Sequence, residues 1–332
     1  MKDHPKVNYG KTGVLLVNLG TPDSTSWWDV RKYLKEFLSD KRVIEVNFFL
    51  WQIILNLFIL TFRPSKTAKA YKEIWMKKEN MSPLRYYTEM QTKKLKEKMK
   101  NEKIIIDHAM RYGNPSIKNT IVNLQKNGCE ELIVLPLYPQ YAAATTATVC
   151  DEVYRSLMKM RWQPSLQIIP HYESEPIYID ALVKSINKKI SELNWKPDLI
   201  VASYHGIPKK YFDKGDPYHC YCQKTSRLII EKFNKIPIQT TFQSRFGPQE
   251  WLQPYTDKTL ENLPKEGKKN ILVVCPGFSS DCVETLEEIA IQGKNSFFKN
   301  GGKNFDIVPC LNDNEDHINL LKHLVDRYNL KK

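Results

Sequence analysis

The 332-residue chain has 42% apolar and 26% charged residues, which is typical of an ordered protein with room for two packed domains. Its formal net charge is +13. The densest basic run, residues 93–103, alternates with apolar residues as a solvated helix does. No zinc-finger spacing or aromatic RNA-binding signature is present, so nucleic acid is not expected as a partner. An anionic membrane surface or an acidic substrate accounts for the charge equally well.

The N-terminus and the cysteines indicate the compartment. Met1 is followed by charged residues with no apolar run behind them, so we expect no signal peptide. Seven cysteines, an odd number, indicate reduced thiols and a cytoplasmic protein. They are spread from Cys129 to Cys310 without a clustered run, so no iron–sulfur cluster is expected. Cys220 and Cys222 fit no common zinc spacing, which favours a structural or incidental role for them.

In chain order, the first half alternates apolar runs with amphipathic segments. Asp23 and Ser24 are good caps for a helix over 28–37, and Ser82 with the proline after it predicts the start of a helix through Lys100. The apolar runs predict buried strands at 13–20, 104–113, 132–141 and 166–171.

The segment 47–62 is unusually apolar, interrupted only by Gln52 and Asn56 one helical turn apart. It is shorter than the roughly 20 residues that span a bilayer. Cations stand on both sides of it: Lys41, Arg42, Arg63, Lys66 and Lys69. Aromatic and aliphatic residues flanked by cations are typical of a segment that dips into a membrane interface, with a buried core helix as the alternative.

The second half of the chain repeats the first. Asn18–Pro22 corresponds to Tyr204–Pro208, and Met110–Gly113 corresponds to Ser244–Gly247; the strands at 132–136 and 166–170 correspond to 271–276 and 305–309. Strands that alternate with helices predict parallel sheets with right-handed crossovers. We therefore expect an α/β fold of two similar doubly wound domains, residues 1–172 and 173–332. Each would have a four-stranded parallel sheet, and the two would flank a central cleft, with the last helix able to pack back on the first domain.

One histidine stands where such a sheet binds ligands. The apolar run 199–202 leads directly to His205, and Gly206 and Pro208 then turn the chain. Ligands bind at this carboxyl edge of open α/β sheets, although a satisfied histidine at a strand end gives the same pattern.

A second polar group follows the strand at 271–276. Ser280 and Asp281 are natural caps for a helix that carries Glu284, Glu287 and Glu288. Acids in a first turn also simply favour the helix dipole. Glu284 and Glu288, however, are four residues apart and share one helix face. An imidazole and a carboxylate that face each other can share a proton abstraction or hold a metal.

A series of motifs spans nearly the whole chain: Val17–Pro22, Ser82–Leu84, Arg111–Tyr112, Tyr138–Tyr141, Ser203–Pro208, Gly247–Trp251 and Ser280–Glu284. With these motifs in this order, the sequence resembles the ferrochelatases, which insert ferrous iron into a porphyrin late in haem synthesis.

This resemblance implies a substrate and a set of site residues. His205 and Glu284 match the essential pair at the porphyrin centre, where they remove protons and meet the metal. The segments that match the porphyrin pocket contribute Leu19, Ser82, Arg111, Tyr112, Tyr138, Tyr141 and Trp251. The expected substrates are protoporphyrin IX and ferrous iron, with no permanently bound cofactor. The apolar segment, within 47–63, corresponds to a lip that touches the bilayer, so Phe48–Phe62 are expected to give peripheral contact with the inner face of the membrane.

Three departures from the family pattern accompany the resemblance. Cys282 stands where many members have a histidine, Gln292 stands where some have an acid, and the sequence stops at Lys332 without a cysteine-rich tail. Three alternatives also stay open: coproporphyrin as substrate, another metal such as cobalt, and a protein that binds a haem or metal chelate without reacting it.

Overall fold

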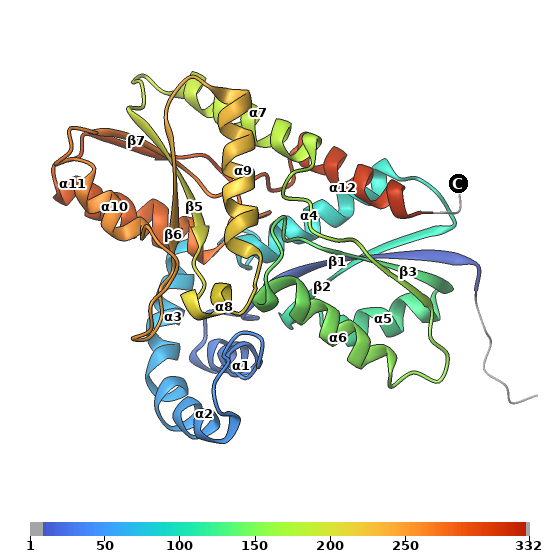
Figure 1. Cartoon of the computed structure of the whole chain (residues 1–332). Helices are drawn as coiled ribbons and strands as arrows, with labels where there is room; N and C mark the ends of the chain where they lie inside the picture. The colour runs from blue at the N-terminus through green and yellow to red at the C-terminus, as the bar shows by residue number, and fades with distance from the viewer. Residues whose placement is uncertain (1–8, 330–332) are drawn as a thin grey trace, which may run out of the picture. The chain divides into compact units, whose positions relative to one another are not determined.

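The computed structural model describes residues 9–329, which form two compact α/β units. The first unit contains the residues up to 137, residues 143–170 and the residues from 318 onward. The second contains residues 138–142 and 171–317. Each unit is built on one sheet with helices packed against it (Figure 1).

The first sheet is parallel throughout, with strand order β2-β1-β3-β4. Its strands are β1 (Lys11–Thr21), β2 (Ile104–Gly113), β3 (Cys129–Pro136) and β4 (Ser165–Ile168). The helical segments of this unit are α1 (Trp27–Leu38), α2 (Phe48–Ile54), η1 (Leu55–Ile59), α3 (Leu60–Ile74), α4 (Pro83–Lys98), α5 (Ile117–Lys126), η2 (Ala143–Ala147) and α6 (Thr148–Leu157). The last helix, α12 (Glu315–Tyr328), belongs to this unit from residue 318. Residues 14–17 of β1 are fully buried, because helices cover both faces of a parallel sheet.

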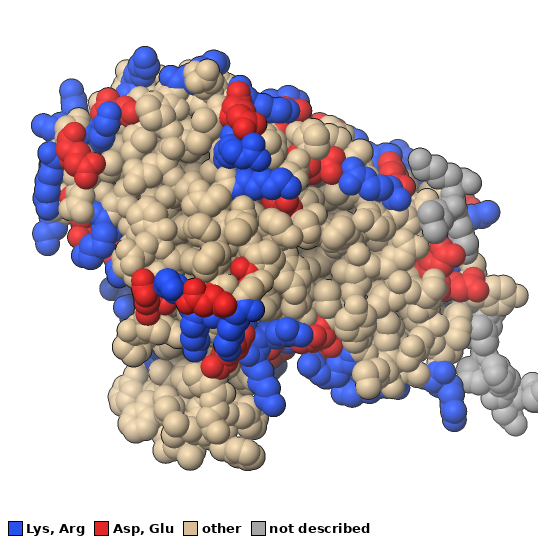
Figure 2. All heavy atoms as spheres, in the orientation of Figure 1, with Lys and Arg blue, Asp and Glu red and all other residues tan. Residues whose placement is uncertain are grey.

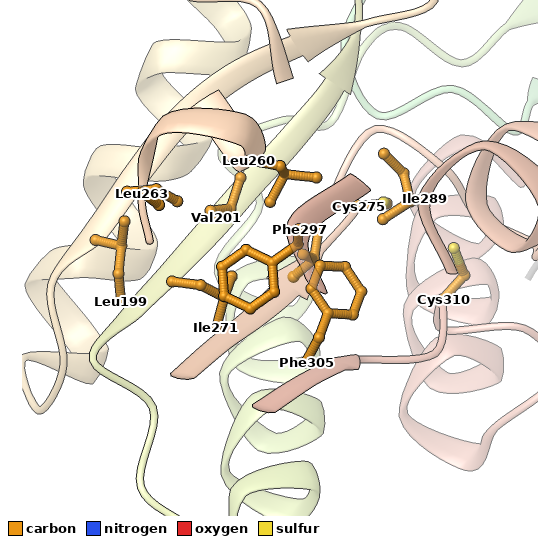
Figure 3. Packing of buried hydrophobic residues seen from close by; sticks show 11 residues of the cluster. Leu199, Val201, Leu260, Leu263, Ile271, Cys275, Ile289, Phe297, Phe305 and Cys310 are labelled. Atoms are coloured by element: carbon orange, nitrogen blue, oxygen red, sulfur yellow. The ribbon is translucent and has the colours of Figure 1, made fainter. Parts of the chain in front are cut away.

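The second sheet is parallel as well, with strand order β6-β5-β7-β8. Its strands are β5 (Leu199–His205), β6 (Ile238–Gln243), β7 (Asn270–Val274) and β8 (Asn304–Ile307). The helical segments are α7 (Pro176–Glu192), α8 (Lys209–Asp213), α9 (Tyr218–Phe233), α10 (Thr256–Asn262), η3 (Glu284–Gly293) and α11 (Lys294–Lys299). Figure 3 shows the apolar cluster between this sheet and its helices, in which Phe297 and Phe305 pack against Ile271.

The two sheets confirm the predicted fold class and the duplication. In each half the first strand lies between the second and the third, and the fourth pairs with the third. The predicted strand at 132–141 is shorter than expected, since β3 ends at Pro136 and a loop follows it.

At two helices the predicted caps were wrong: Asp23 and Ser24 do not cap α1, and Ser280 and Asp281 do not cap η3. The cap of α1 is Ser26, whose hydroxyl accepts from the Asp29 N–H, while Ser24 donates to the Asp29 carboxylate instead of capping. Asp281 likewise caps no helix, because its buried carboxylate accepts from Thr285, Asn312 and a backbone N–H. The cap of α4 is Ser82, as predicted.

The apolar segment 47–62 continues into a longer helical stretch. From Phe48 to Ile74 the chain is helical through α2, η1 and α3. By length and composition alone this stretch could cross a membrane, and 17% of its most apolar window is buried. The shortness of the apolar segment therefore does not by itself exclude a span.

Candidate active site

His205 is the last residue of β5 and lies directly opposite Gln243, the last residue of β6. The next N–H along the chain, that of Gly206, donates to the Gln243 carbonyl at 2.7 Å. The carboxyl ends of β5 and its neighbour β6 thus hold the histidine at the edge of the sheet where open α/β folds bind ligands.

The geometry of the His205 ring defines which nitrogen can accept a proton. Its Nδ1 lies 2.6 Å from the Gly206 carbonyl oxygen. A carbonyl only accepts, so the hydrogen bond requires the proton on Nδ1. In the neutral ring, Nε2 therefore carries the free lone pair, as a general base needs.

Gly206 is required by close packing. A Cβ atom at this position would lie 2.9 Å from the Gln243 carbonyl oxygen and 3.3 Å from the ring of Trp251. The indole of Trp251 is itself buried and donates to the Phe246 carbonyl at 2.9 Å. The predicted pocket tryptophan is thus fixed beside the residue that follows His205.

The acidic helix is a π-helix, η3, which begins at Glu284 itself. Its wider turn joins residues five apart, and π-segments frequently mark functional sites. Gln243 connects this helix to β6: its Nε2 donates to the Glu284 carbonyl at 2.7 Å and lies 3.4 Å from the Glu288 carboxylate. Glu284 and Glu288 therefore both belong to the part of η3 that contacts the end of β6. Glu287 instead accepts from the exposed Gln292.

Glu288 is held by Ser244, the residue after β6. The Ser244 N–H donates to one carboxylate oxygen at 2.8 Å, and its hydroxyl donates to the other. Burial raises the pKa of Glu288, and the charge of Glu284 raises it further, whereas the Ser244 hydroxyl and His205 act in the opposite direction. Glu288 therefore lies within electrostatic reach of both predicted site residues.

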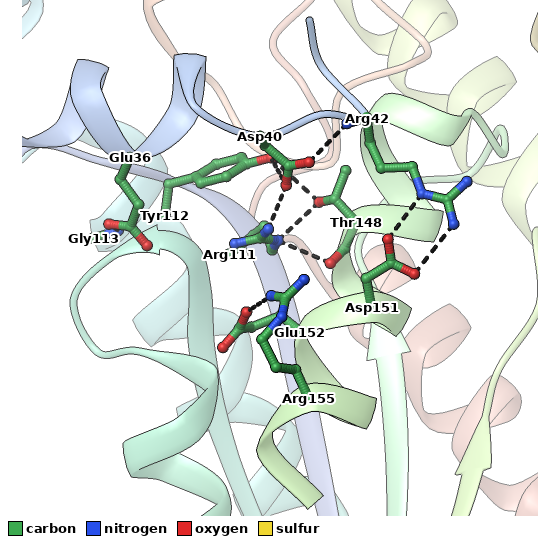
Figure 4. A network of polar contacts seen from close by, with 10 residues as sticks. All are labelled: Glu36, Asp40, Arg42, Arg111, Tyr112, Gly113, Thr148, Asp151, Glu152 and Arg155. Atoms are coloured by element: carbon green, nitrogen blue, oxygen red, sulfur yellow. Dashed lines mark hydrogen bonds and ion pairs between the residues drawn. The ribbon is translucent and has the colours of Figure 1, made fainter. Parts of the chain in front are cut away.

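In the first unit, Arg111 and Tyr112 are paired with Asp40 (Figure 4). The Arg111 guanidinium also donates to the backbone and hydroxyl oxygens of Thr148, both at 2.9 Å. The Tyr112 side chain is fully buried, and burial holds the pKa of its phenol far above the usual value. The polar atoms of both residues thus have partners inside the unit.

The other predicted pocket residues occupy varied places. Leu19 is half-buried near the end of β1 and packs on the cluster around Tyr112. Ser82 is buried at the start of α4, where its hydroxyl accepts from the Arg85 N–H at 3.3 Å. Tyr138 and Tyr141 are half-buried in the loop after β3, which belongs to the second unit.

Three polar residues of these networks were missed from the sequence. Gln243 ends β6, whose sequence Ile-Gln-Thr-Thr-Phe-Gln is mostly polar, so it lacks the apolar run that pointed to His205. Ser244 opens one of the duplicated motifs. Asp40 has no local signal, because its partner is 71 residues away in the chain.

The chain and its fold have clear counterparts among known proteins. The family model described as Ferrochelatase matches residues 11–329. A ferrochelatase from Rhizobium meliloti (strain 1021) is 56% identical over 328 residues, covering 98% of this chain and 97% of the relative. One from Francisella tularensis subsp. tularensis is 51% identical over 322 residues, covering 96% of each chain. Among solved structures, SirB from Bacillus subtilis with Fe3+ aligns with a TM-score of 0.55 and 13% identity over 96% of this chain and 95% of that one. That last likeness shows the fold alone.

Together these findings define a porphyrin metal chelatase, an enzyme of the lyase type. The chain belongs to the ferrochelatase family, and its reaction is the insertion of ferrous iron into a porphyrin in haem biosynthesis.

Proposed function

We propose that the porphyrin is protoporphyrin IX and that His205 and Glu284 act at its centre. The observation that carries this proposal is the link through Gln243, which joins the strand end bearing His205 to the first turn of η3 bearing Glu284. The exposed apolar side chains of α2 favour protoporphyrin, the more apolar of the two candidate porphyrins.

The reaction sets the roles of the two residues. Insertion of a divalent ion into a free-base porphyrin releases two protons from pyrrole nitrogens. The Nε2 of His205 accepts the first, because Nδ1 is held by the Gly206 carbonyl. Glu284 accepts the second or escorts the iron, and both side chains meet the metal as it enters. Glu288 lies one helical turn further on, and burial raises its pKa. We propose that it takes up a proton and passes it away from the porphyrin.

The porphyrin pocket is proposed from the residues that the family pattern implies. Trp251 has the strongest local support, since its buried ring packs at Gly206 beside His205. An aromatic wall of this kind can hold the macrocycle bent towards the metallated shape. Arg111 and Tyr112 would shape the pocket through their fixed contacts with Asp40. The remaining members of the proposed pocket are Leu19, Ser82, Tyr138 and Tyr141.

We further propose peripheral contact with the inner face of the membrane through Phe48–Phe62. Several large side chains of this segment are exposed: Phe48, Phe49, Leu50, Ile53, Leu57, Phe58 and Phe62. Figure 2 shows almost only uncharged side chains in the region at the lower left, where Figure 1 places α2.

The second half of the same helical stretch explains why contact is proposed instead of a span. Leu60, Ala68 and Tyr71 of α3 are buried in the core of the first unit, and Tyr71 packs edge-on against Tyr33 of α1. A span needs about 20 consecutive, predominantly apolar residues. The apolar run ends at Phe62, before Arg63 and the lysines of α3, and the part of α3 that would have to extend it packs on α1.

The proposal includes iron as a substrate and no resident cofactor or iron–sulfur cluster. The chain's seven cysteines carry free thiols, and five of them are buried. Among residues 9–329, no three His, Cys, Asp or Glu side chains lie together as the ligands of one metal centre would, which supports this proposal.

The substrate proposal is tested by incubating the purified protein with ferrous iron and either protoporphyrin IX or coproporphyrin, and following absorbance. Faster metal insertion into protoporphyrin is expected. A preference for coproporphyrin would overturn the substrate, and cobalt in place of iron tests the metal in the same assay.

A further inference from the structure

Gln243 connects the elements of the site through its backbone carbonyl and its side-chain amide. The residue is buried, with 3% of its surface exposed. Its backbone carbonyl accepts from the Gly206 N–H, the peptide next to His205. Its side-chain amide donates to the Glu284 carbonyl.

The amide of Gln243 has a defined orientation. Its Oε1 accepts from the Ser203 hydroxyl at 2.7 Å, and that hydroxyl is also 2.8 Å from the hydroxyl of Thr256. Thr256 in turn lies 2.8 Å from the hydroxyl of Thr241 of β6. A hydroxyl can donate or accept, but the Glu284 carbonyl only accepts, so the NH2 group of the amide must point at η3 and Oε1 at Ser203.

The place where this NH2 group binds is the start of a π-helix. Glu284 is the first residue of η3, and Val283 before it has no side-chain cap bond. The donor from Gln243 thus holds the turn of η3 from which the Glu284 side chain projects. The neighbouring Ser244 holds Glu288 with two hydrogen bonds.

We infer that Gln243 is a positioning residue, which fixes Glu284 and the first turn of η3 relative to His205. It touches neither the porphyrin nor the iron. Its contribution is to keep the carboxylate and the imidazole in the geometry that proton removal needs, as outer partners of metal sites do. The inference rests on the proposed roles of His205 and Glu284.

The test compares turnover of Gln243→Met, Glu284→Gln and the double variant. Methionine keeps the length of the side chain and removes both polar groups. We expect Gln243→Met to lower kcat roughly 10–100-fold with KM for the porphyrin little changed. Because Gln243 acts through Glu284, the double variant should be about as slow as Glu284→Gln alone.

Two further variants keep the test decisive. Gln239→Met makes the same substitution four residues earlier in β6, about 13 Å away along the strand, and should keep the parent kcat. Gln243→Glu keeps the size of the side chain and the acceptor for Ser203 but removes the NH2 donor. If Gln243→Met shows no cooperative thermal unfolding, the turnover of Gln243→Glu is compared instead with that of Glu284→Gln and of the double variant that combines the two.

The outcomes separate the inference from the site assignment. Loss of turnover in His205→Ala and Glu284→Gln, with ordinary turnover in the Gln243 variant, overturns the role of Gln243 alone. Losses from Gln243 and Glu284 that multiply also overturn it, because they would mean a general loss of structure. Ordinary turnover in both His205→Ala and Glu284→Gln overturns the site assignment and the inference together.

Discussion

Arg111 and Asp40 form an ion pair in the interior of the first unit, where their side chains are only 7% and 11% exposed. Tyr112 and Arg42 add hydrogen bonds to the same carboxylate (Figure 4). A charge buried in this way is tolerated only while its partner is present, since removal of one partner leaves the other unpaired and out of water.

Asp40→Ala should therefore lower the free energy of unfolding by about 3–5 kcal/mol, because Arg111 would be left buried and uncompensated. Chemical denaturation measures the loss. The matched control is Asp151→Ala, which breaks the ion pair between Asp151 and Arg42. In this pair the Arg42 side chain is 45% exposed and the Asp151 side chain 34%. That variant should lose less than about 1 kcal/mol. Equal losses in the two variants would contradict the structural role of Asp40.

His317 predicts a pH dependence of stability. Burial lowers the pKa of this histidine to about 4, even though its Nδ1 lies against the Asn312 carbonyl. Above pH 6.5 the ring is neutral in both the folded and the unfolded chain. As the pH falls from 6.5 towards 4, only the unfolded chain takes up the proton, so this residue should cost roughly 3 kcal/mol of stability over that range.

Denaturation curves between pH 4 and 7 test this dependence. His317→Gln cannot be protonated, so its stability should fall less steeply than that of the parent as the pH is lowered. His323→Gln, which removes a half-buried imidazole from the same helix, is the control. An unchanged slope in His317→Gln would show that another group is responsible.

The exposed apolar side chains of α2 and η1 should mediate membrane binding. Replacing Phe49, Ile53 and Leu57 with serine should reduce flotation with vesicles of mixed neutral and anionic lipids, because these side chains supply the buried apolar area. Tyr154→Ser with Met158→Ser removes exposed apolar side chains from α6 and the residue that follows it, and should not change flotation. Undiminished flotation of the triple variant, or resistance of the parent to release by an alkaline wash, would count against peripheral contact.

Protein purified without oxygen should lack the visible absorption of an iron–sulfur cluster, because no three His, Cys, Asp or Glu side chains in the described part of the chain lie together as the ligands of one centre would. Iron and acid-labile sulfide analysis provides an independent check. Stoichiometric sulfide with cluster absorption would show that cysteines distant in the sequence converge on a centre.

The sequence predicted best those features that depend on local pattern. Buried parallel strands are continuous apolar runs, so both sheets and the duplication were visible before the structure. Helix starts were less certain, because Asp23, Ser24 and Ser26 are all good caps and only the path of the chain selects Ser26. His205 was found because it ends an apolar run at a turn.

The parts that could not be predicted depend on distant contacts. The acidic segment was expected to form an ordinary helix, and nothing in its composition distinguishes the π-helix of η3. Asp40 reaches Arg111 across 71 residues, and Gln243 reaches Glu284 across 41. Such pairs are set by the packing of whole elements, so the side chains that support the site remained hidden.

The central claim is that His205 and Glu284 remove protons at the porphyrin centre. Its most direct test is the turnover of His205→Ala and Glu284→Gln with ferrous iron and protoporphyrin, with Glu287→Gln as the control on the same helix. Each of the first two should lose about 10²–10⁴-fold in kcat while porphyrin still binds, and Glu287→Gln should lose little. The double variant should be less impaired than the product of the single losses, because both groups act on one event. Ordinary turnover in His205→Ala would contradict the account.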